Sequence, residues 1–242
     1  MSRARMAIAA VTLVAISAGT PASATTVEPS VDEIVAKHLA ARGGLTKIRS
    51  VQRLVQKGRA SAGAGREALV KRELARPART RFEFTVQGVT SVLVSDGKQG
   101  WVSSPLDGRF DPTPLPAEAV AEAVEQADLD GPLVDWKAKG HRVELANREL
   151  VDGREVYKLQ ITLASGVVRH DYLDVKSHHL VRSVSTRRFR GRPVQVTTTF
   201  GDFKKTQGLL FPHRIEVEAA GRPNRLRVVV DEIEVDSAPR PR

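Results

Sequence analysis

The sequence predicts a mainly β fold of the α+β class, built around a long antiparallel sheet. Three observations support this prediction: many short runs in which apolar and polar residues alternate, turn signals between those runs, and only two longer stretches with helical periodicity. A sheet with one apolar face has to be covered on that face. The two helices, one near the amino terminus and one in the middle of the chain, are expected to cover it.

The first 24 residues have the three parts of a secretory signal peptide. Arg3 and Arg5 precede an apolar run over residues 6–18, and the small residues Ala22 and Ala24 mark a cleavage site after Ala24. The apolar run is too short for a membrane anchor, because spanning a bilayer takes about 20 apolar residues. The sequence has no cysteine that could carry a lipid anchor. We therefore expect a soluble protein exported to the periplasm.

The mature chain, residues 25–242, is long enough for a single large β domain. The formal net charge of the whole chain is +10, and it stays basic after loss of Arg3 and Arg5. The arginines are scattered singly along strand-like segments, which favours a solvated basic surface over a nucleic-acid interface. Attraction to anionic lipid headgroups or to an acidic partner stays open. We expect a monomer with no nucleic-acid partner.

The first element after the signal peptide is predicted to be a helix. Ser30 and Glu33 have the spacing of a capping box, and Gly43 and Gly44 supply a stop at the carboxyl end. Positions i, i+3, i+4, i+7 and i+8 form one apolar stripe. These positions are Val31, Ile34, Val35, His38 and Leu39. A further short helical turn is expected over residues 45–51.

Extended segments are predicted next, over residues 54–101. Phe82 and Phe84 alternate with Arg81 and Glu83, as in a strand that has one apolar face. Turn signals separate this run from its neighbours. We therefore expect a meander of short antiparallel strands in this part of the chain.

The strand signal stops between Pro105 and Pro132. Pro116 is well placed at the first turn of a helix over residues 117–127. Strands are expected to resume over residues 156–163, 167–174, 180–189, 194–200, 214–218 and 226–235.

One segment resembles a known family. Residues 91–101, with the Asp96-Gly97 turn and Trp101, look like the strand-turn-strand signature of the LolA-like periplasmic carriers of outer-membrane lipoproteins. The Arg76-Pro77 step lies upstream with the order and spacing of that family. Later segments, over residues 166–180 and 208–213, are similar to the wider group of lipoprotein-sorting proteins. The chain departs from the carriers in its longer carboxyl-terminal half, which leaves the cargo open.

The resemblance implies a curved antiparallel half-barrel with an apolar concave face, over which helices form a lid. The implied ligands are the acyl chains of lipids or lipoproteins, exchanged with membrane-associated donor and acceptor proteins. The residues expected to line the cavity are Phe82, Phe84, Val92, Val94, Trp101, Leu159, Ile161, Leu163, Val196 and Phe200. Without the resemblance, the same side chains would be assigned to an ordinary core.

Arg76 matches an arginine to which the family gives a specific role. In the family, this arginine donates hydrogen bonds to carbonyls of the lid helices and holds the empty form closed. The chemistry suits that task, because a guanidinium has five donors and the last carbonyls of a helix lack partners. The resemblance therefore implies that Arg76 is a lid latch. The alternative is a solvated arginine at a strand edge.

No pattern of catalytic or metal-binding residues accompanies these features. His178 and His179 are adjacent, so on a strand they would point to opposite faces. His170, Asp171 and Asp174 lie close in sequence, but no second cluster with metal-ligand spacing accompanies them. No Gly-x-Ser-x-Gly, His-Glu-x-x-His or P-loop motif occurs. We expect no catalytic activity, no cofactor and no metal.

Three classes of function remain open at this point, and the least favoured covers enzymes and purely structural roles. The first is a periplasmic carrier or binder of lipids or lipoproteins, which requires a vacant apolar cavity and a movable lid. The second is a periplasmic sensor or regulatory module on the same fold that transports no cargo.

Overall fold

The computed structural model describes residues 28–63, 67–189 and 192–237. These residues are organised around one 13-stranded sheet in which all neighbouring strands are antiparallel. The expected signal peptide lies outside the described residues. Within them, no helix has the length and apolar character needed to cross a bilayer.

The strands of the first half are β1 (Val51–Ala62), β2 (Ala68–Ala75), β3 (Arg79–Val86), β4 (Val89–Ser95), β5 (Gly100–Ser104) and β6 (Arg109–Pro114). Those of the second half are β7 (Arg142–Val151), β8 (Arg154–Thr162), β9 (Val168–Asp174), β10 (Leu180–Phe189), β11 (Arg192–Thr206), β12 (Leu209–Ala219) and β13 (Leu226–Ser237). The helices are α1 (Val31–Ala41), α2 (Leu45–Ser50) and α3 (Ala117–Gln126), with a short 3-10 turn at Pro105–Asp107.

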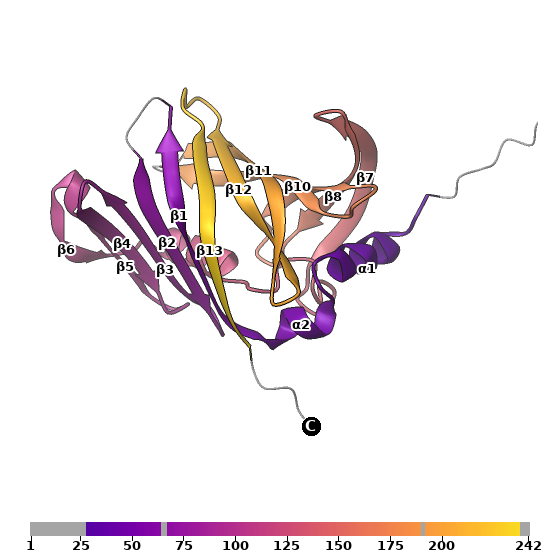
Figure 1. The fold of residues 1–242 in the computed structure, drawn as a ribbon, viewed down its shortest axis with the longest axis horizontal. Coiled ribbons are helices and arrows are strands. Elements are labelled where there is room, and N and C mark those ends of the chain that lie inside the picture. The colour runs from indigo at the N-terminus through magenta and orange to yellow at the C-terminus, as the bar shows by residue number, and fades with distance from the viewer. Residues whose placement is uncertain (1–27, 64–66, 190–191, 238–242) are drawn as a thin grey trace, which may run out of the picture.

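The sheet is strongly curved and does not close. Its first strand, β1, pairs with its last, β13, and this pair lies in the middle of the strand order β6-β5-β4-β3-β2-β1-β13-β12-β11-β10-β9-β8-β7. The two edge strands β6 and β7 are therefore the ends of a half-barrel, and Figure 1 shows the two wings bending away from the central strands. The predicted mainly β, curved antiparallel fold is confirmed.

The first two helices begin and end where the sequence predicts. The Ser30 hydroxyl accepts a hydrogen bond from the Glu33 backbone amide at 3.3 Å, and Glu33 Oε2 accepts one from the Ser30 amide at 2.8 Å. This is the reciprocal capping box. At the other end, Gly43 and Gly44 have φ values of 118° and 91°, which few other residues adopt. α2 follows directly.

Two strands were missed by the sequence analysis. The expectation that residues 105–132 contain no strand is wrong, because β6 pairs with β5 there. Pro112 and Pro114 are tolerated because β6 is an edge strand, where a missing amide donor breaks no ladder on the outer side. β7 was also not predicted, because its alternation of Val143 and Leu145 fades into Asn147 and Arg148 further along.

The main core lies between α1, α2 and the inner, concave face of the sheet. Ile34 of α1 and Ile48 of α2 are 1% and 2% exposed, and they belong to one cluster with Leu159 and Ile161 of β8. Leu54 of β1 belongs to the same cluster. Helices α1 and α2 therefore cover the β7–β9 end of the concave face.

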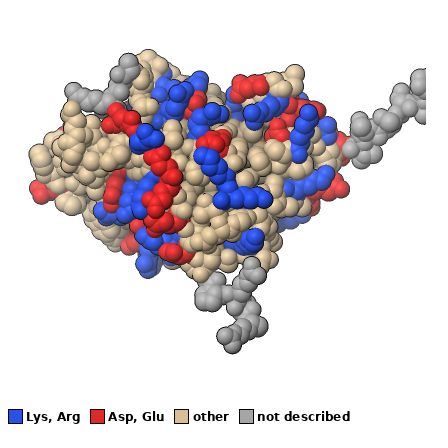
Figure 2. Space-filling view, viewed as in Figure 1, with Lys and Arg blue, Asp and Glu red and all other residues tan. Residues whose placement is uncertain are grey.

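The outer, convex face carries ion pairs across neighbouring strands. Lys57 Nζ on β1 lies 2.6 Å from Glu234 Oε1 on β13, and Arg59 Nε lies 3.0 Å from Asp231 Oδ2 on the same pair of strands. Figure 2 shows Lys and Arg side chains interleaved with Asp and Glu over these strands. The convex face over β1 and β13 is therefore covered by charged side chains.

Candidate functional site

Helix α3 lies over the half of the concave face that α1 leaves free. Its Val120 and Ala123 are buried, and it packs against β3 and β4. The alanines of α3 contribute only small side chains to this packing. Pro116 directly precedes α3, one position before the first turn where the sequence analysis placed it, and makes no side-chain cap hydrogen bond.

A groove with a volume of about 1290 Å³ runs along α3. Its walls come from nearly every residue of α3, the β2–β3 and β4–β5 turns, the β8–β9 turn and the end of β10. Most of the exposed lining is apolar. The apolar lining side chains include Pro77, Val120, Val124, Leu163, Val167 and Pro193.

The β4–β5 turn beside the groove has a defined local cause. Asp96 Oδ1 accepts hydrogen bonds from the backbone amides of Lys98 and Gln99, each at 2.8 Å. Gly97 has a φ of 92°, and a Cβ there would lie 2.9 Å from the Cβ of Ala78 in the β2–β3 turn. Gly97 therefore lets two turns meet at the groove wall.

Polar contacts tie α3 to both wings of the sheet. On one wing, Arg72 Nη2 of β2 donates to the carbonyl oxygen of Gln126, in the last turn of α3, at 2.8 Å. On the other wing, Arg187 of β10 donates to both carboxylate oxygens of Glu125, at 3.1 and 3.0 Å. α3 thus bridges the concave side of the half-barrel and has the placement of a lid.

Arg76 holds the segment that follows α3 through Asp130, and it also donates to carbonyls at the carboxyl end of α2. It donates to Asp130 from Nη1 at 2.9 Å and from Nη2 at 2.6 Å, and from Nε to the Val51 carbonyl at 2.7 Å. Its Nη2 also lies 3.4 Å from the carbonyl oxygen of Arg49 in α2. The hydrogen bonds to Asp130 raise the pKa of Arg76. The lid-latch role of Arg76 stays a prediction.

Arg42 reinforces this attachment. Its Nη1 donates to the backbone carbonyl of Asp130 at 2.7 Å. Lys139 Nζ donates to Asp128 at 2.6 Å and to the Gly131 carbonyl at 2.9 Å. The loop after α3 is therefore held by three basic side chains, among them Arg76.

The predicted cavity residues fall into four groups in the structure. Leu163 alone among them lines the groove. Leu159 and Ile161 are both 0% exposed, so they form the core beneath α1 and not a groove wall.

Phe82 and Phe84 lie on the concave face beside α3. Phe82 pairs with Arg72, which contacts α3, and it is 40% exposed. Following the paired residues across β2, β1, β13 and β12 places Val196 and Phe200 on this same face. All four side chains are partly exposed, with four strands between β3 and β11, and their contact with a ligand stays a prediction.

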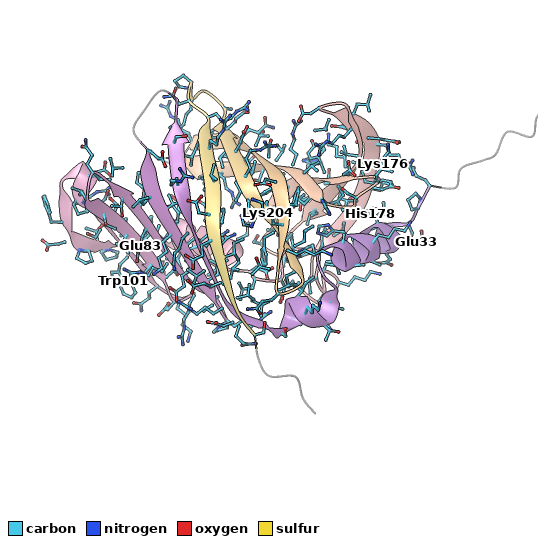
Figure 3. The ribbon with its side chains drawn as sticks, in the orientation of Figure 1. Glu33, Glu83, Trp101, Lys176, His178 and Lys204 are labelled. Carbon is cyan, nitrogen blue, oxygen red and sulfur yellow. The ribbon has the colours of Figure 1, made fainter. Side chains whose placement is uncertain are left out.

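Val92, Val94 and Trp101 lie on the opposite, convex face. Val92 pairs with Glu83, and Val94 pairs with Arg81 and with Trp101. Figure 3 shows Glu83 and Trp101 in the same wing of the sheet. The predicted set therefore mixed residues of both faces, because alternation gives the spacing within a strand but not which set turns inward.

The residues that attach α3 to the sheet were not found from the sequence. These are Arg72, Glu125 and Arg187, with Arg169 beside them. The sequence feature that could have pointed to them is the composition of α3, which contains three glutamates and no basic residue. A helix with such an uncompensated charge indicates basic partners elsewhere in the fold.

The histidines give no sign of a metal site. His38 of α1 is buried, and its Nδ1 lies 2.8 Å from the carbonyl oxygen of His178. Burial, together with the charge of Arg42, lowers the pKa of His38 to about 4. Across the described ranges, no group of three or more His, Cys, Asp or Glu side chains is placed to hold a metal ion.

Comparison with known proteins identifies the architecture. The sequence matches no family model and no curated protein. The structure superposes with a TM-score of 0.55 on a LolA superfamily protein from Nitrosomonas europaea, at 15% sequence identity, with 88% of this chain and 96% of the other covered. The chain has the LolA-like fold.

Two further structures agree with this fold. An outer membrane lipoprotein-sorting protein domain from Vibrio parahaemolyticus superposes with a TM-score of 0.55 at 11% identity, covering 86% of this chain and 93% of the other. A DUF1329 family protein from Desulfovibrio piger gives a TM-score of 0.55 at 14% identity, covering 85% and 93%. In the LolA-like fold, the groove under α3 lies on the concave side of the half-barrel.

Proposed function

We propose that this protein is a periplasmic carrier or binder of lipids or lipoproteins, and that the groove along α3 holds their acyl chains. The observation that carries the proposal is the groove itself, with a volume of about 1290 Å³ on the concave face of a LolA-like half-barrel. Pockets for small ligands have volumes of roughly 300–1,000 Å³. A larger, mostly apolar groove suits a long chain.

The energetics favour such a ligand. Each methylene removed from water stabilises the complex by about 0.8 kcal/mol. The partly exposed Phe82, Phe84, Val196 and Phe200 extend the apolar surface beyond the groove wall. Acyl chains are long, flexible and apolar, so they follow a curved surface of this kind.

The predicted periplasmic location agrees with a ligand that has acyl chains. The signal peptide predicted over residues 1–24 directs the chain out of the cytoplasm, and the remaining residues, 25–242, form one domain under this proposal. Apolar chains crossing the aqueous periplasm require a protein that shields them. Donor and acceptor proteins at the two membranes would load and unload it.

The proposal is tested with an environment-sensitive fluorescent fatty acid. Ala121 is an exposed alanine of α3 that lines the groove, so Ala121→Trp should fill part of the volume and weaken binding. Ala36→Trp is the matched control, because Ala36 is an exposed alanine of α1 outside the groove. Weaker fatty-acid binding in Ala121→Trp, with unchanged binding in Ala36→Trp, supports the proposal. Absence of binding to the wild type contradicts it and favours a sensor or regulatory module.

A further inference from the structure

The sheet wall of the groove carries two arginines that converge on one carboxylate. Arg187 donates to both oxygens of Glu125, at 3.1 and 3.0 Å. Arg169 Nη1 lies 3.9 Å from Glu125 Oε1. Paired residues across β9, β10 and β11 place Arg169 and Arg187 on the same face as Val196. Both arginines line the groove, with side chains 15% and 23% exposed.

The side chain of Arg169 is oriented by hydrogen bonds to Asp171 and Ser183 of the sheet. Its Nε and Nη2 donate to Asp171 Oδ1 at 3.0 and 2.8 Å, and Nη2 donates to the Ser183 hydroxyl at 2.8 Å. Asp171 is 1% exposed, so it forms a fixed buried support. These bonds direct the remaining nitrogen, Nη1, toward the groove.

Glu125 forms hydrogen bonds with Arg187 but not with Arg169. Both of its oxygens are bound by Arg187, and the distance of 3.9 Å to Arg169 Nη1 is too long for a hydrogen bond. A phosphate has more acceptor oxygens than a carboxylate, and it can bind two guanidinium groups at once. Arg169 is bound to Asp171 and Ser183 through Nε and Nη2, so its Nη1 is the nitrogen that a phosphate held by Arg187 can also reach.

The lid and the wall have opposite charge. Glu118, Glu122 and Glu125 of α3 line the groove. When α3 moves away to admit a ligand, these three carboxylates leave with it. Arg187 then loses its ion pairs with Glu122 and Glu125, whereas Arg169 keeps its ion pair with Asp171. Partly buried cations without a counter-charge are costly. An incoming anionic group removes that cost, whereas a neutral ligand does not.

We propose that the groove selects amphiphiles with an anionic headgroup, whose phosphate replaces Glu125 on Arg169 and Arg187 while the acyl chain lies along α3. This inference rests on the proposed function and specifies its ligand class. Leu163 and Val167 line the groove close in sequence to Arg169, so charged and apolar walls are continuous. Glu125 then acts as an internal substitute for the headgroup in the closed form.

The test compares two ligands with the same acyl chain, lysophosphatidic acid and monoacylglycerol, on the full mature chain. The wild type should bind the phosphate form tighter by about tenfold or more, the value of one charge-assisted hydrogen bond. Arg187→Gln should abolish this preference, so that the variant binds the two ligands with equal affinity. Arg182→Gln is the matched control, because Arg182 lies on the same strand with its side chain on the opposite face.

The outcomes separate this inference from the proposed function. Equal binding of both ligands by the wild type overturns the anionic selectivity and leaves the acyl-chain proposal standing. If neither ligand binds, both proposals are overturned. Inorganic phosphate is the third probe: weak competition supports a lipid headgroup as the source of the anion. Inorganic phosphate that binds as tightly as lysophosphatidic acid overturns the lipid selectivity in favour of a free-phosphate site.

Discussion

Acidification should destabilise the protein through one buried histidine. His38 is 4% exposed in the core side of α1, and its Nδ1 donates to the carbonyl oxygen of His178 at 2.8 Å. Burial is the main reason why the pKa of His38 falls from 6.5 to about 4, and the charge of Arg42 adds to it. Between about pH 4 and pH 6.5, the His38 imidazole is therefore neutral in the folded protein but protonated in the unfolded chain.

The sign and size of the effect follow from these two pKa values. Above pH 6.5 the imidazole is neutral in both states, so stability is complete. As the pH falls toward 4, protons bind the unfolded state first and stability is lost. At about 1.36 kcal/mol per pKa unit, the loss between about pH 7 and pH 5 is about 2 kcal/mol. For a domain of this size, that lowers the melting temperature by roughly 4–8 °C.

The assay is thermal unfolding at a series of pH values, for the wild type and His38→Asn. Asparagine keeps a donor near the position of Nδ1 but does not titrate, so the variant should lose about 2 kcal/mol less stability over this pH interval than the wild type. Parallel pH profiles of the two proteins would refute the assignment of this pH dependence to His38.

Three further predictions concern the core, the attachment of the lid and export. Leu159→Ala should destabilise the fold by about 2–5 kcal/mol in denaturant unfolding, because Leu159 is fully buried. Phe82→Ala should lower the free energy of unfolding far less, because Phe82 is 40% exposed. Equal losses of unfolding free energy in the two variants would contradict these positions. Arg76→Leu breaks both hydrogen bonds to Asp130, so it should raise fluorophore binding in the empty protein and slow ligand release, with only partial rescue by lysine; unchanged binding and release would make Arg76 a purely structural residue. Amino-terminal sequencing of the exported protein should begin at Thr25, and a start at Met1 in the membrane fraction would exclude the soluble form.

Local signals in the sequence were sufficient for most elements. The capping box at Ser30 fixed the start of α1, and the alternation around Phe82 fixed a strand, because both depend on neighbours within a few residues. β6 was missed because its tolerance of Pro112 depends on its place at the edge of the sheet. That place is a property of the whole fold.

The composition of the site was less predictable, for the same reason. Val92 and Phe82 both follow a period of two, but only the register between β3 and β4 shows that they face opposite sides. The contact between Glu125 and Arg187 joins residues from distant parts of the chain. The resemblance gave the half-barrel and a lid, but it pointed to Arg76 and not to the arginines that hold α3.

The most direct test of the account is photo-crosslinking with a fatty acid that carries a diazirine at the end of its chain. Labelled peptides should contain residues 117–126 of α3 and residues 163–167 of the β8–β9 turn, because both segments line the groove. Labelling should be competed by unlabelled fatty acid and reduced in Ala121→Trp. Labelling confined to exposed apolar residues elsewhere, such as Leu69 or Leu150, with none on α3 would contradict the claim that the groove holds acyl chains.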